Sequence, residues 1–265
     1  MAYNLFDTHC HLDFEVFDED REEVVKRAYE QGVRSIFIPG TCRDTPRVRP
    51  QTMAGVQLFY AVGLHPYFIA DHNNEDLDWV EQQLQEHAGY WVGEIGLDRT
   101  CPDWDQQCDL FVQQVELAVK YQRPVILHHR KSQSDLLHYL KPYLDDLPDQ
   151  KGILHAFSGS PEQAQDWISK GFKLGVGGTI TYSRAKKTRA ALKDSPLDAL
   201  VLETDAPDMP VCGYQGERNE PCHVADVIAS LAELRDEDKD VIARQLWQTS
   251  CELIPLDADD DNATC

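Results

Sequence analysis

The stretch Asp7–Asp13 has the sequence DTHCHLD and directly follows the short apolar run Tyr3–Phe6. A short apolar run that is bounded in this way predicts a buried strand. Because side chains alternate along a strand, His9 and His11 are expected to point to the same side. Two imidazoles on one side of a strand end can bind one metal ion, whereas a turn with two exposed histidines is the alternative.

Apolar runs alternate with amphipathic helical segments along the rest of the chain. The predicted strands are residues 3–6, 35–38, 58–62, 91–92, 124–127, 152–154, 172–176 and 197–202. The predicted helices are residues 18–31, 77–87, 104–121, 132–143, 185–193, 225–234 and 236–247, together with one that begins at the capping-box pattern of residues 160–163.

Most of the predicted strands are continuous apolar runs, which is typical of a parallel sheet covered on both faces. A doubly wound open sheet is the competing architecture, but it normally carries a glycine-rich phosphate loop after the first strand. Here histidines follow the first strand, so we predict an α/β fold of the (β/α)8 TIM-barrel type. Residues 1–256 are expected to form one domain, and residues 257–265 an acidic, disordered tail.

The charge balance limits the classes of partner. The chain has 25 basic and 46 acidic residues, which gives a formal net charge of −21. Such a surface repels polyanions at long range, which argues against a non-specific nucleic-acid coat but not against a phosphate bound locally by metal. The chain shows neither a membrane-spanning apolar stretch nor a secretory signal, and its eight cysteines form no Cys-x-x-Cys pair, so a cytoplasmic protein with reduced thiols is expected.

Ionisable side chains follow the ends of most predicted strands. The carboxyl ends of barrel strands are the face on which barrel enzymes build their active sites. Nitrogen and oxygen donors without thiolate favour zinc, manganese or magnesium ions. The candidates are His9 and His11 after the first strand, His65 after the third, Glu94 after the fourth, His128 after the fifth, His155 after the sixth, and Glu203 and Asp205 after the eighth.

These side chains suit one or two divalent ions. Two ions roughly 3.5–4 Å apart need a bridging carboxylate, and Glu94 is placed to supply it. Asp205 can hold one ion and also accept the proton of a bound water. A structural role in a loop is the alternative for His65, and support of a metal ligand is the alternative for Glu203.

Adjacent strand residues point in opposite directions, so only one of His128 and His129 should enter the site. We choose His128, because Arg130 then faces the same way and can bind a phosphate or carboxylate. A plain surface ion pair is the alternative for Arg130. Ordinary surface positions are expected for the remaining histidines, which are His72, His87, His138 and His223.

The motifs of this chain together resemble those of the TatD family, and most of all its YjjV branch. The family consists of metal-dependent hydrolases of the amidohydrolase-like barrel group, several of which are deoxyribonucleases. The resemblance covers residues 5–254 and rests on seven motifs: DTHCHLD at 7–13, GLHP at 63–66, GEIGLD at 93–98, LHHR at 127–130, HAFSG at 155–159, LETDAP at 202–207 and RNEP at 218–221.

The resemblance implies a phosphodiester hydrolase with two divalent metal ions (magnesium, manganese or zinc) and with Asp205, Glu94 and Arg130 as catalytic residues. It also implies DNA as a substrate. Because the chain is acidic and shows no basic patch, we expect short single-stranded ends or a small phosphoester instead of long DNA, and no obligate protein partner is evident. Hydrolysis of a small amide or lactone is the alternative, and a binding protein with a vestigial site is a third. By motif position, one ion would be bound by His9, His11, Glu94 and Asp205, the other by Glu94, His128 and His155, and the site would be lined by His65, Arg130 and Glu203.

Overall fold

The computed structural model describes residues 3–254, so the predicted tail at 257–265 lies outside the described residues. Eight parallel strands follow one another in a single sheet in the order β1-β2-β4-β5-β6-β7-β8-β9, and β3 pairs antiparallel with β4. The strands are β1 (Leu5–Asp7), β2 (Val33–Ile38), β3 (Thr52–Met53), β4 (Val56–Val62), β5 (Trp91–Asp98), β6 (Val125–Arg130), β7 (Gly152–Leu154), β8 (Lys173–Val176) and β9 (Leu200–Leu202).

The two ends of this sheet meet along a seam, which we define as residues 8–11 and 202–206. Thr8 donates a backbone hydrogen bond to Leu202 O at 2.9 Å, and Asp205 donates one to His9 O at 2.9 Å. Cys10 and Ala206 form an isolated parallel bridge between them. The sheet is therefore a nearly closed parallel barrel, which confirms the predicted (β/α)8 fold.

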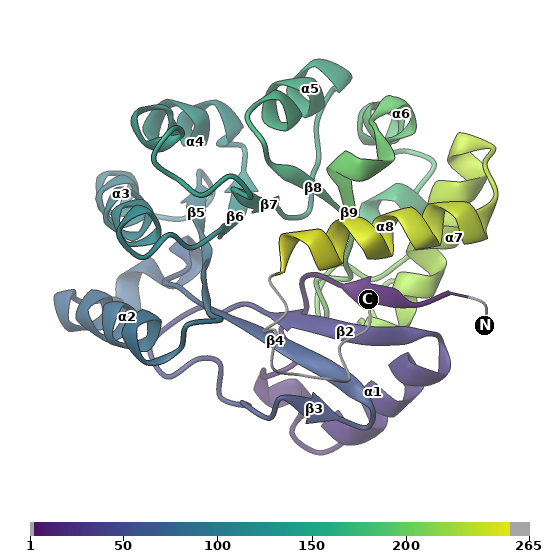
Figure 1. The fold of residues 1–265 in the computed structure, drawn as a ribbon, viewed down its shortest axis with the longest axis horizontal. Coiled ribbons are helices and arrows are strands. Elements are labelled where there is room, and N and C mark those ends of the chain that lie inside the picture. Colours follow the sequence, from purple (N-terminus) through teal and green to yellow (C-terminus); the bar gives the residue numbers. More distant parts are fainter. Residues whose placement is uncertain (1–2, 255–265) are drawn as a thin grey trace.

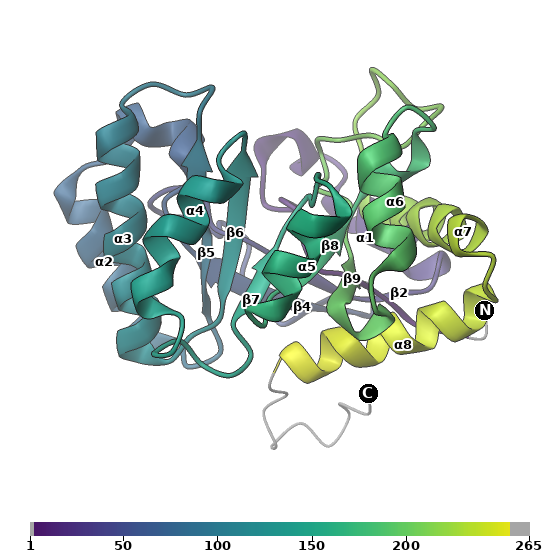
Figure 2. The same ribbon diagram turned by 90° about the horizontal axis from the view of Figure 1, so that it is seen from above.

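The helices surround the barrel, as Figures 1 and 2 show. The α-helices are α1 (Arg21–Glu30), α2 (Asn74–Glu86), α3 (Trp104–Tyr121), α4 (Gln133–Leu140), α5 (Pro161–Ser169), α6 (Lys186–Asp194), α7 (Val224–Arg235) and α8 (Lys239–Leu253). Short 3-10 helices lie at Glu15–Phe17, Pro66–Asp71, Lys141–Tyr143, Gly178–Thr181, Leu197–Ala199 and Pro221–His223. None of the helices described for residues 3–254 is long and apolar enough to cross a membrane.

Local sequence explains where several of these elements begin and end. Ser160 and Gln163 form the expected capping box at the start of α5. The strand predicted to end at Val92 instead runs on through Glu94, because Gly93 and Gly96 let β5 approach β6 closely. A Cβ atom on Gly96 would lie 2.1 Å from His128 O.

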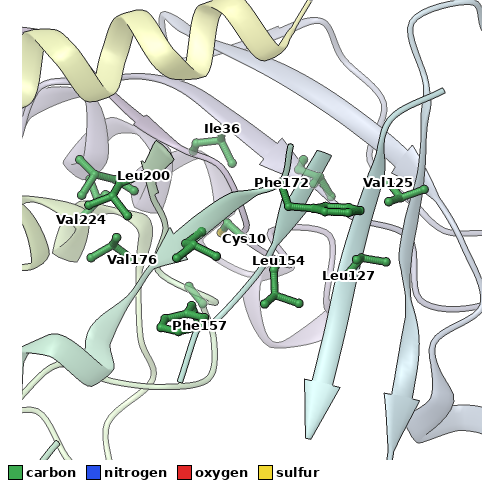
Figure 3. Packing of buried hydrophobic residues seen from close by; sticks show 14 of the residues in the cluster. Cys10, Ile36, Val125, Leu127, Leu154, Phe157, Phe172, Val176, Leu200 and Val224 are labelled. Carbon is green, nitrogen blue, oxygen red and sulfur yellow. The ribbon is translucent and has the colours of Figure 1, made fainter. Parts of the chain in front are cut away.

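Buried apolar side chains form two clusters on opposite sides of the strands. The larger cluster packs the sheet against the surrounding helices, and Figure 3 shows part of it. The smaller cluster takes one residue from each of seven strands, so these residues face the barrel axis, where Trp247 and Leu253 of α8 pack against them. The seven are Phe6, Phe37, Ala61, Trp91, Ile126, Ile153 and Val201.

Side chains two positions apart in a strand point to the same face, so the inward-facing positions continue from the apolar core to the site. Two residues after Ile126 comes His128, and two after Ile153 comes His155. The apolar layer therefore fills the lower part of the barrel, and ionisable side chains occupy the next inward layer towards the carboxyl ends of the strands.

Candidate metal centre

The Glu94 carboxylate lies at the centre of the site, and its Oε2 atom faces the seam. His9 Nε2 is 3.1 Å from Oε2, and His11 Nε2 is 3.4 Å from it. Asp205 Oδ1 lies 3.4 Å from His9 Nε2 and 3.7 Å from His11 Nε2. The four residues that the sequence assigns to one ion are therefore brought together.

The other oxygen of Glu94, Oε1, faces three further imidazoles. His155 Nε2 is 2.8 Å away, His128 Nδ1 is 3.0 Å away and His65 Nε2 is 3.1 Å away. His65 also accepts a hydrogen bond from Tyr67 N through Nδ1, so it has a role in its loop as well as a place in the site. One carboxylate thus faces a different set of donors through each of its two oxygens.

The donor set fits divalent ions. His9 Nε2 lies 3.3 Å from His11 Nε2, 3.1 Å from Glu94 Oε2 and 3.4 Å from Asp205 Oδ1, but it carries at most one proton and so cannot donate to all three. Ions placed among these atoms would satisfy the converging lone pairs. Three groups have ligand atoms that all lie within 4.8 Å of one another: His9, His155 and Glu203; His9, His11 and Asp205; and His65, Glu94 and His128.

The first of these groups includes Glu203, which has a carboxylate oxygen within 4.8 Å of a ring nitrogen of His9 and of His155. Its carboxylate is fully buried beneath the site and accepts a hydrogen bond from Ala156 N. The Oε2 atom of Glu203 has no hydrogen-bond partner among the described residues. Both interpretations of Glu203, as a ligand and as a support for a ligand, are therefore compatible with its position.

Burial and crowding perturb the carboxylates of the site. Burial raises the pKa of Asp205 to about 7, and the charge of Glu94 adds to this effect. Burial, together with the charge of Asp205, raises the pKa of Glu203 well above its usual value. Burial alone would raise the pKa of Glu94, but the surrounding imidazoles hold it well below its usual value. The site therefore contains one ionised carboxylate at its centre and one, Asp205, that can exchange a proton near neutral pH.

The imidazoles separate into two kinds. Burial lowers the pKa of His9 to about 4 and that of His155 to about 3, so both are neutral and ready to bind metal. Burial also opposes the charge on His11 and His128, but neighbouring carboxylates outweigh it and raise the pKa of each to about 9. Glu94 is one of the carboxylates that raise the pKa in both cases.

Two buried carboxylates that the sequence analysis did not assign support the ligands. Asp98 Oδ2 lies 3.3 Å from His128 Nε2, on the far side of that ring from Glu94. Asp7 accepts hydrogen bonds from the backbone N and the hydroxyl of Thr204, at 2.9 and 2.6 Å. A signal was present for Asp98, since it follows Glu94 by four residues in one strand and so lies on the same side.

The sequence also led to predictions for three residues near the site, His129, His72 and Arg130. His129 lies away from Glu94, 3.4 Å from Gln133 Nε2, which agrees with the choice of His128. His72 was wrongly expected at the surface: it is buried, because the 3-10 helix Pro66–Asp71 turns the chain so that its Nε2 lies 3.0 Å from His65 O. The exposed Arg130 guanidinium has no hydrogen-bond or ion-pair partner within residues 3–254, so its role in the site stays a prediction.

The chain is similar to known proteins over nearly its whole length. Residues 6–255 match the family described as "TatD related DNase". The chain is 43% identical over 258 residues to the uncharacterized metal-dependent hydrolase YjjV of Escherichia coli, a match that covers 96% of this chain and 98% of that protein. It is 30% identical over 264 residues to the 3'-5' ssDNA/RNA exonuclease TatD of Erwinia billingiae, which covers 96% of this chain and 100% of that protein.

A solved structure shows the same fold. The crystal structure of YjjV, a TatD homolog from Escherichia coli, superposes with a TM-score of 0.89 at 40% identity. The match covers 97% of this chain and 100% of that chain. On the family match, the identity and the shared fold, this chain belongs to the TatD-related DNase family of metal-dependent hydrolases.

Proposed function

We propose that this protein hydrolyses phosphodiester bonds with two divalent metal ions and acts on the ends of single-stranded DNA in the cytoplasm. The observation that carries the proposal is the Glu94 carboxylate, whose two oxygens face two different sets of metal-binding side chains. The Erwinia billingiae relative, named a 3'-5' ssDNA/RNA exonuclease, supports the choice of substrate.

Each part of the site has a role in this proposal. His9, His11, Glu94 and Asp205 would hold one ion, and Glu94, His128 and His155 would hold the other. When bound, such a pair of ions supplies a reactive hydroxide at neutral pH and neutralises charge on the phosphate. Magnesium, manganese and zinc all suit these nitrogen and oxygen donors.

Two residues would act directly on the reacting groups. Asp205, whose Oδ1 lies 3.4 Å from His9 Nε2 among the donors of the first ion, is placed to accept the proton of the attacking water and return it to the leaving oxygen. The guanidinium of Arg130 could donate two parallel hydrogen bonds to two oxygens of the phosphate, which would orient the scissile bond.

A substrate panel tests the proposal. Purified protein with magnesium, manganese or zinc is offered labelled single-stranded DNA, a model phosphodiester, and a set of lactones and amides. We expect metal-dependent cleavage of the DNA and of the phosphodiester. Turnover of a lactone or an amide alone would exclude the nuclease function and favour the alternative substrate class.

The variant Glu94→Gln tests the two-metal arrangement. It should bind less metal and lose at least 100-fold in activity, because it removes the charge shared by both donor sets. His138→Ala, which removes an exposed histidine on α4, is the matched control and should behave as the wild type. Full activity of Glu94→Gln would refute the bridging role.

A further inference from the structure

A cleft of about 540 Å³ opens beside the candidate metal centre. Its apolar wall includes Phe14, Val16, Phe68 and Pro207. This volume lies within the range of roughly 300–1,000 Å³ that is usual for sites that bind small molecules. The cleft is therefore large enough to hold one component of a substrate.

Two aromatic rings connect this cleft to the metal centre. The ring of Phe14 stacks on that of His11, with centroids 4.6 Å apart and an interplanar angle of 19°. The ring of Phe68 meets that of His65 at 66°, with centroids 6.2 Å apart. Both phenylalanines are only partly buried. A group that occupies the cleft would therefore lie next to a bond held at the metal ions.

The charges around the cleft favour an uncharged occupant. Arg218 lies at its edge, but its guanidinium is held by Asp20 and Glu220 at 2.7 and 2.9 Å. Arg47 is likewise 3.2 Å from Glu15, whose carboxylate also lines the cleft. Both arginines that line the cleft in the described chain are thus neutralised, so an uncharged, flat group fits this surface best.

We propose that the cleft binds the unpaired terminal nucleobase, next to the scissile phosphodiester, and stacks it on Phe14 or Phe68. This inference rests on the proposed function. Stacking of one base on an aromatic side chain strengthens binding roughly 5-fold to 100-fold, whatever the base. The terminal base of a duplex is paired and stacked on its neighbour, and it must give up both contacts to enter the cleft. The cleft therefore selects single-stranded ends through stacking and does not need a basic surface.

Two oligonucleotides test the subsite. They have the same sequence, but in one the terminal base is replaced by an abasic tetrahydrofuran residue, which keeps the sugar and phosphate. The wild type should favour the intact end by roughly 5-fold to 100-fold in kcat/KM. Phe14→Leu and Phe68→Leu should each bring this ratio towards one, whereas Phe68→Trp should keep it.

Tyr29→Leu is the matched control. Tyr29 is an exposed aromatic residue of α1 that packs on Arg34 and beside Gly55, and it does not line the cleft. This variant should keep the wild-type ratio. Metal analysis of Phe14→Leu separates stacking of the base from support of His11: an equal loss on both oligonucleotides together with lost metal would overturn the stacking role of Phe14.

The outcomes distinguish this inference from the proposed function. Equal cleavage of the intact and abasic ends by the wild type would overturn the base subsite and leave the nuclease function standing. Failure to cleave either oligonucleotide or a model phosphodiester, by protein shown to hold metal, would overturn both.

Discussion

His128 is held between two carboxylates, one on each ring nitrogen. Its Nδ1 lies 3.0 Å from Glu94 and its Nε2 lies 3.3 Å from Asp98. Asp98 is fixed in turn by Thr100, which donates to it through its backbone N and its hydroxyl. A carboxylate behind a metal-binding histidine sets both the orientation of the ring and the nitrogen that carries the proton. Asp98 is therefore a positioning residue for the metal centre.

Asp98→Asn should weaken metal binding roughly 10-fold to 100-fold. The amide of asparagine can donate to Nε2 of His128, which would move the ring proton to Nδ1, the nitrogen that faces Glu94. Titration against a chelator of known affinity measures the change. Thr100→Val, which removes only the hydroxyl that anchors Asp98, is the control and should bind metal nearly as the wild type. Unchanged affinity in Asp98→Asn would show that Asp98 does not position His128 for metal binding.

Metal binding should release protons and become stronger as pH rises. His11 and His128 have a pKa of about 9 in the metal-free protein, so they are protonated at pH 7.5, whereas a metal ligand must be neutral. Each displaced proton makes the affinity up to about tenfold higher per pH unit below that pKa. Calorimetry at pH 7.5 in two buffers of different ionisation enthalpy should detect roughly one to two protons released per protein. Binding without proton release would contradict the assignment of these two ligands.

The sequence located most of the side chains that converge on Glu94, because they follow apolar runs that are easy to recognise. What it did not predict depends on how strands pair. Asp98 meets His128 because β5 and β6 pair with Gly96 opposite His128, a register that neither strand specifies alone. The hydrogen bond from Thr204 to Asp7, next to the seam, likewise joins residues 197 positions apart.

The elements show the same division between local and distant causes. Long apolar periodicity located α3 at its observed bounds, Trp104–Tyr121. The predicted strand at 197–202 is shorter, because Leu197–Ala199 forms a 3-10 turn after Pro196 before β9 begins. The short β3 was not predicted, since two residues carry no periodic signal and their partner, β4, defines them.

Gly175 of β8 leaves space for the buried carboxylate of Glu203, the residue that directly follows β9. A Cβ atom at this position would lie 2.2 Å from Glu203 Oε2. Gly175→Ala should therefore displace Glu203 and lower the free energy of unfolding by about 1–3 kcal/mol, as measured by urea denaturation. Gly89→Ala is the control, because a Cβ atom there meets nothing within 4 Å. Equal stability of the two variants would show that β8 can shift without cost.

The net charge of the whole molecule sets how it meets a polyanion. A formal charge of −21 repels DNA at long range, and salt screens this repulsion. The KM for a single-stranded oligonucleotide should therefore fall as monovalent salt rises from about 10 to 150 mM, where the Debye length shortens from about 30 to 8 Å. A small phosphodiester, with a single charge, is the control and should show little change. A steep rise in KM would instead indicate a set of phosphate contacts on a basic surface.

The seam has a consequence for the order in which the protein is made. His9 and His11 leave the ribosome nearly two hundred residues before Thr204 and Asp205, which close the seam. During that interval residues 8–11 have no partners across the seam, and the group of His9, His11 and Asp205 is incomplete. Assembly of the candidate metal centre therefore waits until Thr204 and Asp205 have been made, and a nascent fragment that ends before Thr204 contains both histidines without the partners that would make them a site.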